Sequence, residues 1–206
     1  MHETLPVRLI GVAPVLMHNG RGSDPLDPMA KQLARLTRKR RKTDADHQQI
    51  ARIEWHMSLW TDGGRPCFPG EAVEAALIQA ARTKRLGRAA AAGVLCPGNP
   101  LLEYEGPTTI DDLWADERFR LRVPVQVQRR RTMRTRPIFS EWSITADLQF
   151  LPNLLDEAQV LEIVRIAGDQ IGLGNWRPRF GRFRVEAMGD TAHRRGLAGQ
   201  GKARLC

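Results

Sequence analysis

One segment of the chain, residues 171–183, combines three residue types that bind phosphate-bearing polymers. Glycine lets the backbone approach a ligand closely and adopt positive φ, arginine forks phosphate oxygens, and tryptophan stacks on a base. The alternative is structural: a glycine ends the preceding helix and a proline turns the chain into the next strand. The candidate residues of this segment are Gly172, Gly174, Trp176, Arg177, Arg179, Gly181 and Arg182.

Two further runs of basic residues point to the same chemistry. Six of the eight residues 35–42 are Lys or Arg, and five arginines fall within 129–136. The chain carries 32 Lys and Arg against 23 Asp and Glu, for a formal net charge of +9. Such clustering is typical of nucleic-acid-binding proteins, although a solvated basic face, an anionic lipid or an acidic protein partner would suit the same residues. The candidates here are Lys39, Arg40, Arg41, Arg129, Arg130, Arg131, Arg134 and Arg136.

His18 is the one histidine whose position suits catalysis. As a general base or acid it would act on a ribose 2′-hydroxyl, while Arg131 or Arg177 stabilises the charge of the phosphorane. The other histidines show no pairing pattern, and a lone histidine in a loop is more often a hydrogen-bonded structural residue. We therefore predict a binding protein that is not an enzyme, with His18 as the catalytic candidate of the minority hypothesis.

The sequence predicts no metal ion and no cofactor. Its three cysteines are far apart and never form a Cys-x-x-Cys pair, so neither a zinc site nor a disulfide framework is indicated. The acids clustered at 24–27 and 44–46 suit turns and helix caps better than a magnesium site. The Gly-x-Gly pair at 172–174 follows a predicted helix, which is the wrong context for a dinucleotide site.

The sequence also shows no charged and apolar leader and no apolar run near the length of a membrane span. We expect a protein of the bacterial cytoplasm that has no contact with a membrane.

The periodicity of apolar residues predicts the elements that position these side chains. Strands are expected at 5–12, 101–105, 119–128, 141–150 and 183–187, and helices at 29–38, 46–60, 70–82 and 155–171. The strands at 119–128 and 141–150 alternate strictly and are expected to pair with each other, with an arginine-rich excursion at 129–137 between them.

Without a helical insertion at 18–66 and the short strand at 101–105, the elements follow the order strand, helix, strand, strand, helix, strand. This order predicts an α+β fold with a ferredoxin-like βαββαβ core, the pattern that RNA-recognition domains also use, and its two helices would cover one sheet face. We expect a single domain over residues 1–189 and a flexible basic tail over 190–206.

In the order of its elements and in three short motifs, the chain resembles the RAMP superfamily of CRISPR proteins, and within it the repeated subunit that coats guide RNA. The resemblance rests on Phe68-Pro69-Gly70 at the start of the first core helix, the arginine-bearing excursion at 129–137, and the glycine-rich loop at 172–181. The whole chain also resembles proteins of bacteriophages and prophages, through Met17-His18-Asn19-Gly20 and the segment 134–139.

Charge, predicted core and resemblance together favour a protein that binds single-stranded nucleic acid, DNA or RNA, and tolerates any nucleotide sequence. The resemblances imply that it is encoded by a phage or prophage and forms an oligomer or filament along the strand. They also imply an alternative, an RNA-processing endoribonuclease or CRISPR effector subunit. A third hypothesis is a structural viral protein whose basic arms hold the packaged genome.

Overall fold

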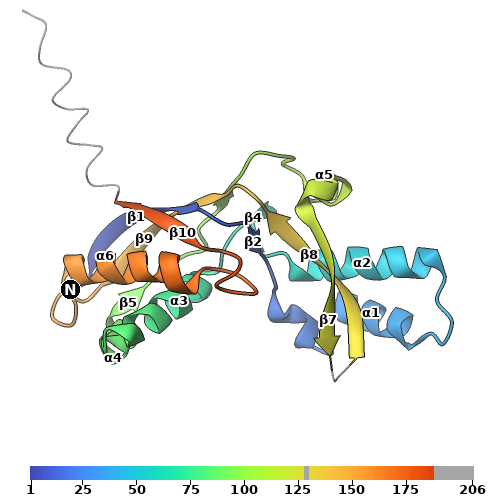
Figure 1. The fold of residues 1–206 in the computed structure, drawn as a ribbon, viewed down its shortest axis with the longest axis horizontal. Coiled ribbons are helices and arrows are strands. Elements are labelled where there is room, and N and C mark those ends of the chain that lie inside the picture. Colours follow the sequence, from blue (N-terminus) through green and yellow to red (C-terminus); the bar gives the residue numbers. More distant parts are fainter. Residues whose placement is uncertain (128–129, 188–206) are drawn as a thin grey trace, which may run out of the picture.

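The structure is a computed structural model that describes residues 1–127 and 130–187. The molecule is elongated, with a sheet and its helices at one end and a hairpin with two helices at the other (Figure 1). The fold is α+β, as predicted. The strands are β1 (Glu3–Gly11), β2 (Val15–Leu16), β3 (Thr61–Asp62), β4 (Arg65–Pro66), β5 (Val94–Leu95), β6 (Leu102–Glu103), β7 (Arg120–Val127), β8 (Arg130–Phe139), β9 (Ser143–Phe150) and β10 (Phe183–Ala187).

Four of the helices confirm the four expected above to within a few residues, and the short helices at 87–93 and 110–115 are additional to them. They are α1 (Pro28–Arg38), α2 (Asp44–Ser58), α3 (Gly70–Thr83), α4 (Gly87–Gly93), α5 (Ile110–Ala115) and α6 (Glu157–Ile166), with 3-10 turns η1 (Gly20–Ser23) and η2 (Glu117–Phe119) and a π-helical turn η3 (Ala167–Ile171). None of the helices within the described ranges is long and apolar enough to cross a membrane. The predicted tail, 190–206, lies outside those ranges.

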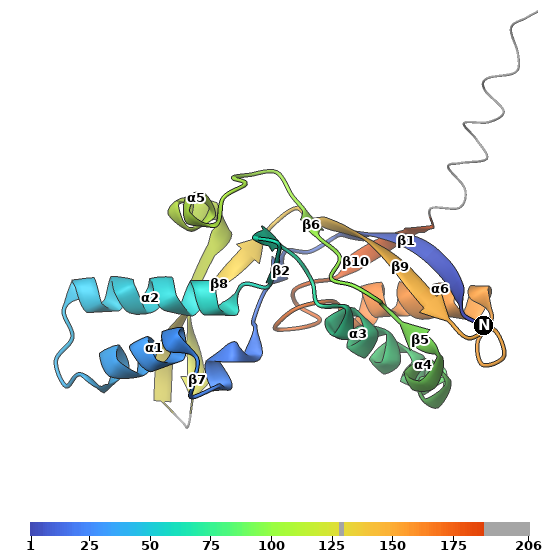
Figure 2. The ribbon, with the colours of Figure 1, turned by 180° about the vertical axis from the view of Figure 1, so that it is seen from behind.

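The main sheet has the strand order β10-β1-β9-β5, and each of these neighbours is antiparallel. The short strand β6 pairs with the opposite end of β9 from β5. Helices α3 and α6 lie on one face of this sheet in both ribbon views (Figures 1 and 2). The alternation of β1 explains this layering, because Leu5, Val7 and Leu9 are buried while Thr4 and Arg8 are exposed.

Helix α3 packs closely because its inner face is made of small residues. Val73, Ala76, Leu77 and Ala80 are each at most 1% exposed, as their helical spacing predicts. The helix begins at Gly70, where a Cβ would lie 2.1 Å from the carbonyl oxygen of Cys96. A glycine is therefore needed for the start of α3 to lie against the chain that leads out of β5.

The other end of the molecule is built from the hairpin β7–β8 and helices α1 and α2. Asp27 caps α1 by accepting from the backbone N–H groups of Met29 and Ala30, at 2.8 and 3.1 Å. Thr43 and Asp46 form a capping box at the start of α2. These caps confirm that the clustered acids serve the helices, and no three His, Cys, Asp or Glu side chains in the described ranges gather as metal ligands.

The predicted pairing of segments 119–128 and 141–150 is wrong. β7 pairs with β8 from Arg120 opposite Pro137 to Val127 opposite Arg130, and β9 pairs with β1 instead. The arginine-rich segment is thus mostly a strand rather than an excursion, and the short strands β5 and β6 occupy the second core position. The physical reason is that strict alternation shows a half-buried strand but does not identify its neighbour.

Candidate nucleic-acid interface

The glycine loop that follows η3 is held against strand β2. The N–H of Asn175 donates to the carbonyl oxygen of Leu16 at 2.7 Å, and that of Gly181 donates to the carbonyl of Pro14 at 2.8 Å. Within the loop, the N–H of Leu173 donates to the carbonyl of Gly181 at 2.8 Å. Because β2 also pairs with the end of β8, these bonds place the glycine loop beside β8.

The loop's own packing explains its three glycines. Gly172, Gly174 and Gly181 have φ of 78°, 76° and 76°, which other residues rarely adopt. A Cβ on Gly174 would lie 2.4 Å from the carbonyl oxygen of Leu16, and one on Gly181 would lie 1.8 Å from that of Leu173. The structural alternative thus accounts for glycine at these positions, and their role in binding phosphate stays a prediction.

Arg136 extends from β8 to this loop. Its guanidinium donates to Oδ1 of Asn175 and lies 5.8 Å from the ring centre of Trp176, within the range of a cation–π contact. The Trp176 side chain is exposed, with a relative exposure of 38%, and its ring centre lies 6.0 Å from that of Phe180. Burial, followed by the neighbouring charge of Arg134, lowers the pKa of Arg136 from its ordinary value.

Arg134, two residues earlier on β8, is bound to a buried carboxylate. Glu54 of α2 is 7% exposed and accepts hydrogen bonds from the Arg134 guanidinium and from the backbone N–H of Thr135, the latter at 3.0 Å. A buried carboxylate needs such partners because an unpaired charge is costly to remove from water. Glu54 therefore fixes the position of β8 against α2.

These side chains line one pocket of about 540 Å³, which we call the junction pocket. It lies where β8, α2, η1 and the glycine loop meet, and its volume is in the range typical of small-ligand sites. The ionisable side chains among its lining residues are His18, Glu54, Arg134 and Arg136. One carboxylate faces two guanidinium groups, so the pocket carries a net positive charge.

His18 is exposed to solvent at this pocket. Partial burial of its imidazole is the main cause that lowers its pKa, and the charges of Arg136 and Arg134 lower it further. The ring is consequently neutral at neutral pH. The structure thus places the candidate general base next to two arginines, although not the two that the sequence analysis assigned to it.

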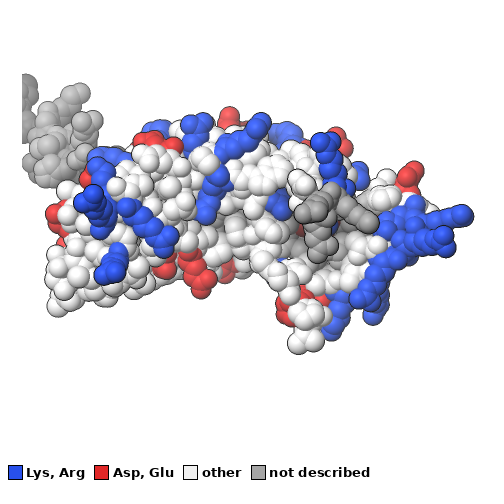
Figure 3. All heavy atoms as spheres, turned by 60° about the horizontal axis from the view of Figure 1, so that its bottom comes forward, with Lys and Arg blue, Asp and Glu red and all other residues white. Residues whose placement is uncertain are grey.

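The structure brings four of the predicted residues together: His18, Arg134, Arg136 and Trp176 all line the junction pocket. The basic run at 35–42 lies elsewhere. It forms the corner between α1 and α2, where Lys and Arg side chains gather at one end of the molecule (Figure 3). Lys39, Arg40 and Arg41 are all exposed there, and Nζ of Lys39 lies 2.6 Å from a carboxylate oxygen of Asp46.

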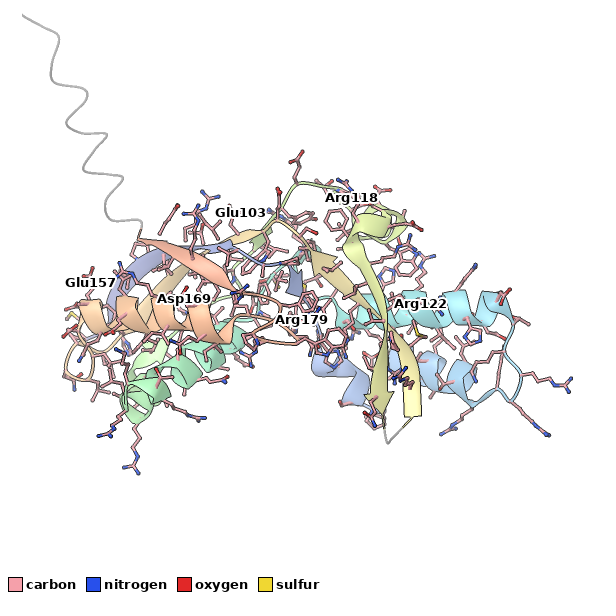
Figure 4. The ribbon with its side chains drawn as sticks, in the orientation of Figure 1. Glu103, Arg118, Arg122, Glu157, Asp169 and Arg179 are labelled. Carbon is pink, nitrogen blue, oxygen red and sulfur yellow. The ribbon has the colours of Figure 1, made fainter. Side chains whose placement is uncertain are left out.

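The other predicted arginines whose side chains the structure describes do not line the junction pocket. Arg131 is exposed on the hairpin, and Arg177, Arg179 and Arg182 are exposed on the glycine loop. Arg177 also donates to the carbonyl oxygen of Gly172 at 3.3 Å. Figure 4 shows Arg179 on the side of the molecule between the sheet and the hairpin. Arg129 lies outside the described residues, and only the backbone of Arg130 is described.

The sequence analysis missed Glu54 and Asn175, which hold the two pocket arginines in place. A signal for Glu54 was present. Glu54 lies one helical turn from both Ile50 and Ser58 on α2 and follows the buried Ile53. This spacing places its carboxylate on the face of the helix that points inward. A charge at such a position indicates a buried cationic partner.

A second pocket, of about 600 Å³, lies on the other side of the contact between α2 and β8 and shares Glu54, Arg134 and Thr135 with the junction pocket. Arg122 of β7, which Figure 4 labels, lines it together with Lys42 from the basic corner. Its lining residues include the imidazole of His47 but no Trp, Tyr or Phe. Of these two pockets, the junction pocket is the one whose lining joins arginines to a tryptophan.

The face of the main sheet away from the helices is polar. Glu103, which Figure 4 shows above the sheet, accepts from Arg8 at 2.8 Å, from Ser143 at 2.9 Å and from Thr145 at 3.3 Å. The residues that β1, β9 and β10 direct to this face include no aromatic ring. Sheets that bind RNA stack bases on such rings, so this face does not suit that role.

No protein-family model and no curated protein matches this chain.

Proposed function

We propose that this protein binds single-stranded nucleic acid without sequence preference, and that the junction pocket is the centre of the interface. The observation that supports this most strongly is the convergence of Arg134 and Arg136 on one pocket that holds a single carboxylate and the exposed ring of Trp176. The surplus charge suits a phosphate, and the ring suits an unpaired base. No duplex can present a base to Trp176 without opening.

The proposed interface extends from this pocket over the exposed arginines of the glycine loop and the hairpin. Contacts to phosphate carry no sequence information, and stacking tolerates every base. Both therefore predict sequence-tolerant binding. Polymerisation along the strand belongs to the same proposal, and it is supported by β7, which is the outer strand of its sheet within the described ranges.

The proposal includes a ferredoxin-like core of the RAMP type in a protein of phage or prophage origin. The order β10-β1-β9-β5, with all neighbours antiparallel and α3 and α6 on one face, supports that core. In this arrangement α1, α2 and the hairpin β7–β8 are additions to the core, and the junction pocket lies between the core's last loop and these additions.

Binding of single strands is expected to be tight at low salt and to weaken steeply as salt is added. The logarithm of the affinity should fall against the logarithm of the salt concentration by about 0.7 for each phosphate that is neutralised. Fluorescence anisotropy with labelled single-stranded DNA, single-stranded RNA and duplex DNA measures this. A preference for duplex, or an affinity that salt leaves unchanged, contradicts the proposal.

Replacing Arg177 and Arg179 together with alanine is expected to weaken single-strand binding by about tenfold, because two phosphate contacts are lost. The melting temperature should stay nearly the same, since exposed arginines contribute little to stability. The matched control is the Arg82→Ala, Arg88→Ala double variant, which removes the same charge from α3 and α4. Equal affinities of the two double variants would exclude the glycine-loop arginines from the interface.

A second candidate function is cleavage of RNA, and the position of His18 favours it. A neutral imidazole beside two guanidinium groups matches a general base next to groups that stabilise a phosphorane. The RNA recovered from the binding experiment decides between the two functions. Intact RNA supports a binding protein, whereas cleavage that His18→Ala abolishes supports the enzyme.

A further inference from the structure

We infer that the junction pocket receives one nucleotide unit of the bound strand, with its phosphodiester between Arg136, Arg134 and His18 and its base on the exposed ring of Trp176, and that His18 takes up a proton as the phosphate enters. This inference rests on the proposed function and specifies the ligand of its central site. Because His18 takes up a proton on binding, we expect binding to be stronger at lower pH.

The geometry supports a phosphate at this end of the pocket. Arg136 uses a guanidinium nitrogen to hold Asn175, which fixes the plane of the group, and its remaining donors are available to a ligand. Arg134 is bound to Glu54, but its side chain is 32% exposed and lines the pocket. The neutral side chains of Asn19 and Gln126 add further donors.

The geometry also supports a base next to the phosphate. Trp176 lies on the same loop as Asn175 and has the exposed area that a stacked base requires. Arg136 lies 5.8 Å from the ring centre, so a phosphate held by this arginine lies within one nucleotide of the indole. The cavity of about 540 Å³ has room for a single nucleotide.

The charges around His18 explain why binding and protonation are coupled. On β8, Arg134 and Arg136 face the imidazole; on α2, Glu54 is the ionisable group; and β7, η1 and the glycine loop add none to the lining of this pocket. In the free protein, burial and the two arginines lower the pKa of His18. A phosphate that enters supplies an opposite charge and raises that pKa.

The sign of the effect follows from this difference. At a pH between the pKa of free His18 and the higher pKa of the complex, the bound protein holds more protons than the free protein. Lowering the pH therefore favours the complex, by up to about tenfold in affinity for each pH unit within that window. Above the window His18 is neutral in both states, and it adds nothing to the pH dependence.

The test measures binding of fluorescein-labelled oligothymidylate, with a 5′-hydroxyl end, between about pH 8 and pH 6, where histidine titrates and the oligonucleotide does not. We expect the affinity of the wild type to rise by at least about fivefold on lowering the pH. His18→Gln should lose this rise. His47→Gln, whose histidine lines the second pocket, should keep it.

An abasic strand of the same length tests the position of the base. The wild type should bind it about tenfold more weakly than oligothymidylate, because one stacked base contributes roughly 1–3 kcal/mol. Trp176→Leu should bind both strands alike. If the wild type binds single strands at no pH, the proposed function itself is wrong. If it binds them but His18→Gln keeps the pH dependence, or Trp176→Leu still prefers bases, only this inference is wrong.

Discussion

A Glu54→Ala protein is expected to lose about 3–5 kcal/mol of its free energy of unfolding, the range observed when one partner of a buried ion pair is removed. The substitution leaves the guanidinium of Arg134 without its carboxylate and the backbone N–H of Thr135 without an acceptor. It also leaves a cavity on the inner side of α2. Denaturant-induced unfolding measures the change.

Glu103→Ala is the matched control for this variant. Glu103 also pairs with an arginine, at 2.8 Å from Arg8, but both side chains are nearly half exposed, at 47% and 44%. An exposed pair of this kind contributes about 1 kcal/mol or less. Glu54→Gln keeps an acceptor for the N–H of Thr135, so its loss of unfolding free energy should lie between those of Glu54→Ala and Glu103→Ala. Equal stabilities of Glu54→Ala and Glu103→Ala would show that Glu54 does not hold β8 in place.

The helices and the basic corner were predictable from the sequence because their signals are local. The apolar spacing of α2 and the caps of α1 and α2 depend on residues a few positions apart. The same signals placed the basic run 35–42 between two helices, as the structure confirms. Charge pattern alone did not show that this run lies far from the glycine loop (Figure 1).

The strand that pairs with β9 was not predictable. The alternation of its residues shows that one face is buried, but it does not show which strand lies beside it. The arginine-rich segment of β8 suggested an excursion, because it lacks the alternation of apolar residues that predicts a strand. Arg134 is accommodated there only because Glu54, 80 positions earlier, meets it, and Arg136 because Asn175 does. The position of Glu54 on α2 indicates a cationic partner but not which residue it is, and for that reason the junction pocket emerges only from the structure.

Arg136→Ala is expected to weaken single-strand binding more than any other single substitution of an arginine in the glycine loop or on the hairpin. Its guanidinium is half-buried, held by Asn175 and placed against Trp176, so little side-chain entropy is lost when it meets a phosphate. A charge-assisted contact of this kind is worth about 1.5–3 kcal/mol, which corresponds to roughly 10- to 150-fold in affinity.

Two further variants distinguish the effect of the junction pocket on binding from the effect of the protein's overall positive charge. Arg165→Ala removes one exposed positive charge from α6, outside the proposed interface. Arg136→Lys keeps the charge but lacks the planar fork that binds phosphate and stacks on Trp176. We expect Arg165→Ala to bind like the wild type and Arg136→Lys to recover only part of the affinity that Arg136→Ala loses.

The most direct test of the junction pocket as the centre of the interface is the dissociation constant of a single-stranded oligonucleotide of about 20 nucleotides, measured by anisotropy at low salt, where phosphate contacts are strongest. The wild type, Arg136→Ala and Arg165→Ala are compared after their melting temperatures have been checked. We predict that only Arg136→Ala binds at least about tenfold more weakly. Indistinguishable constants for Arg136→Ala and Arg165→Ala would contradict the account, and binding would then have to be sought at the basic corner 35–42.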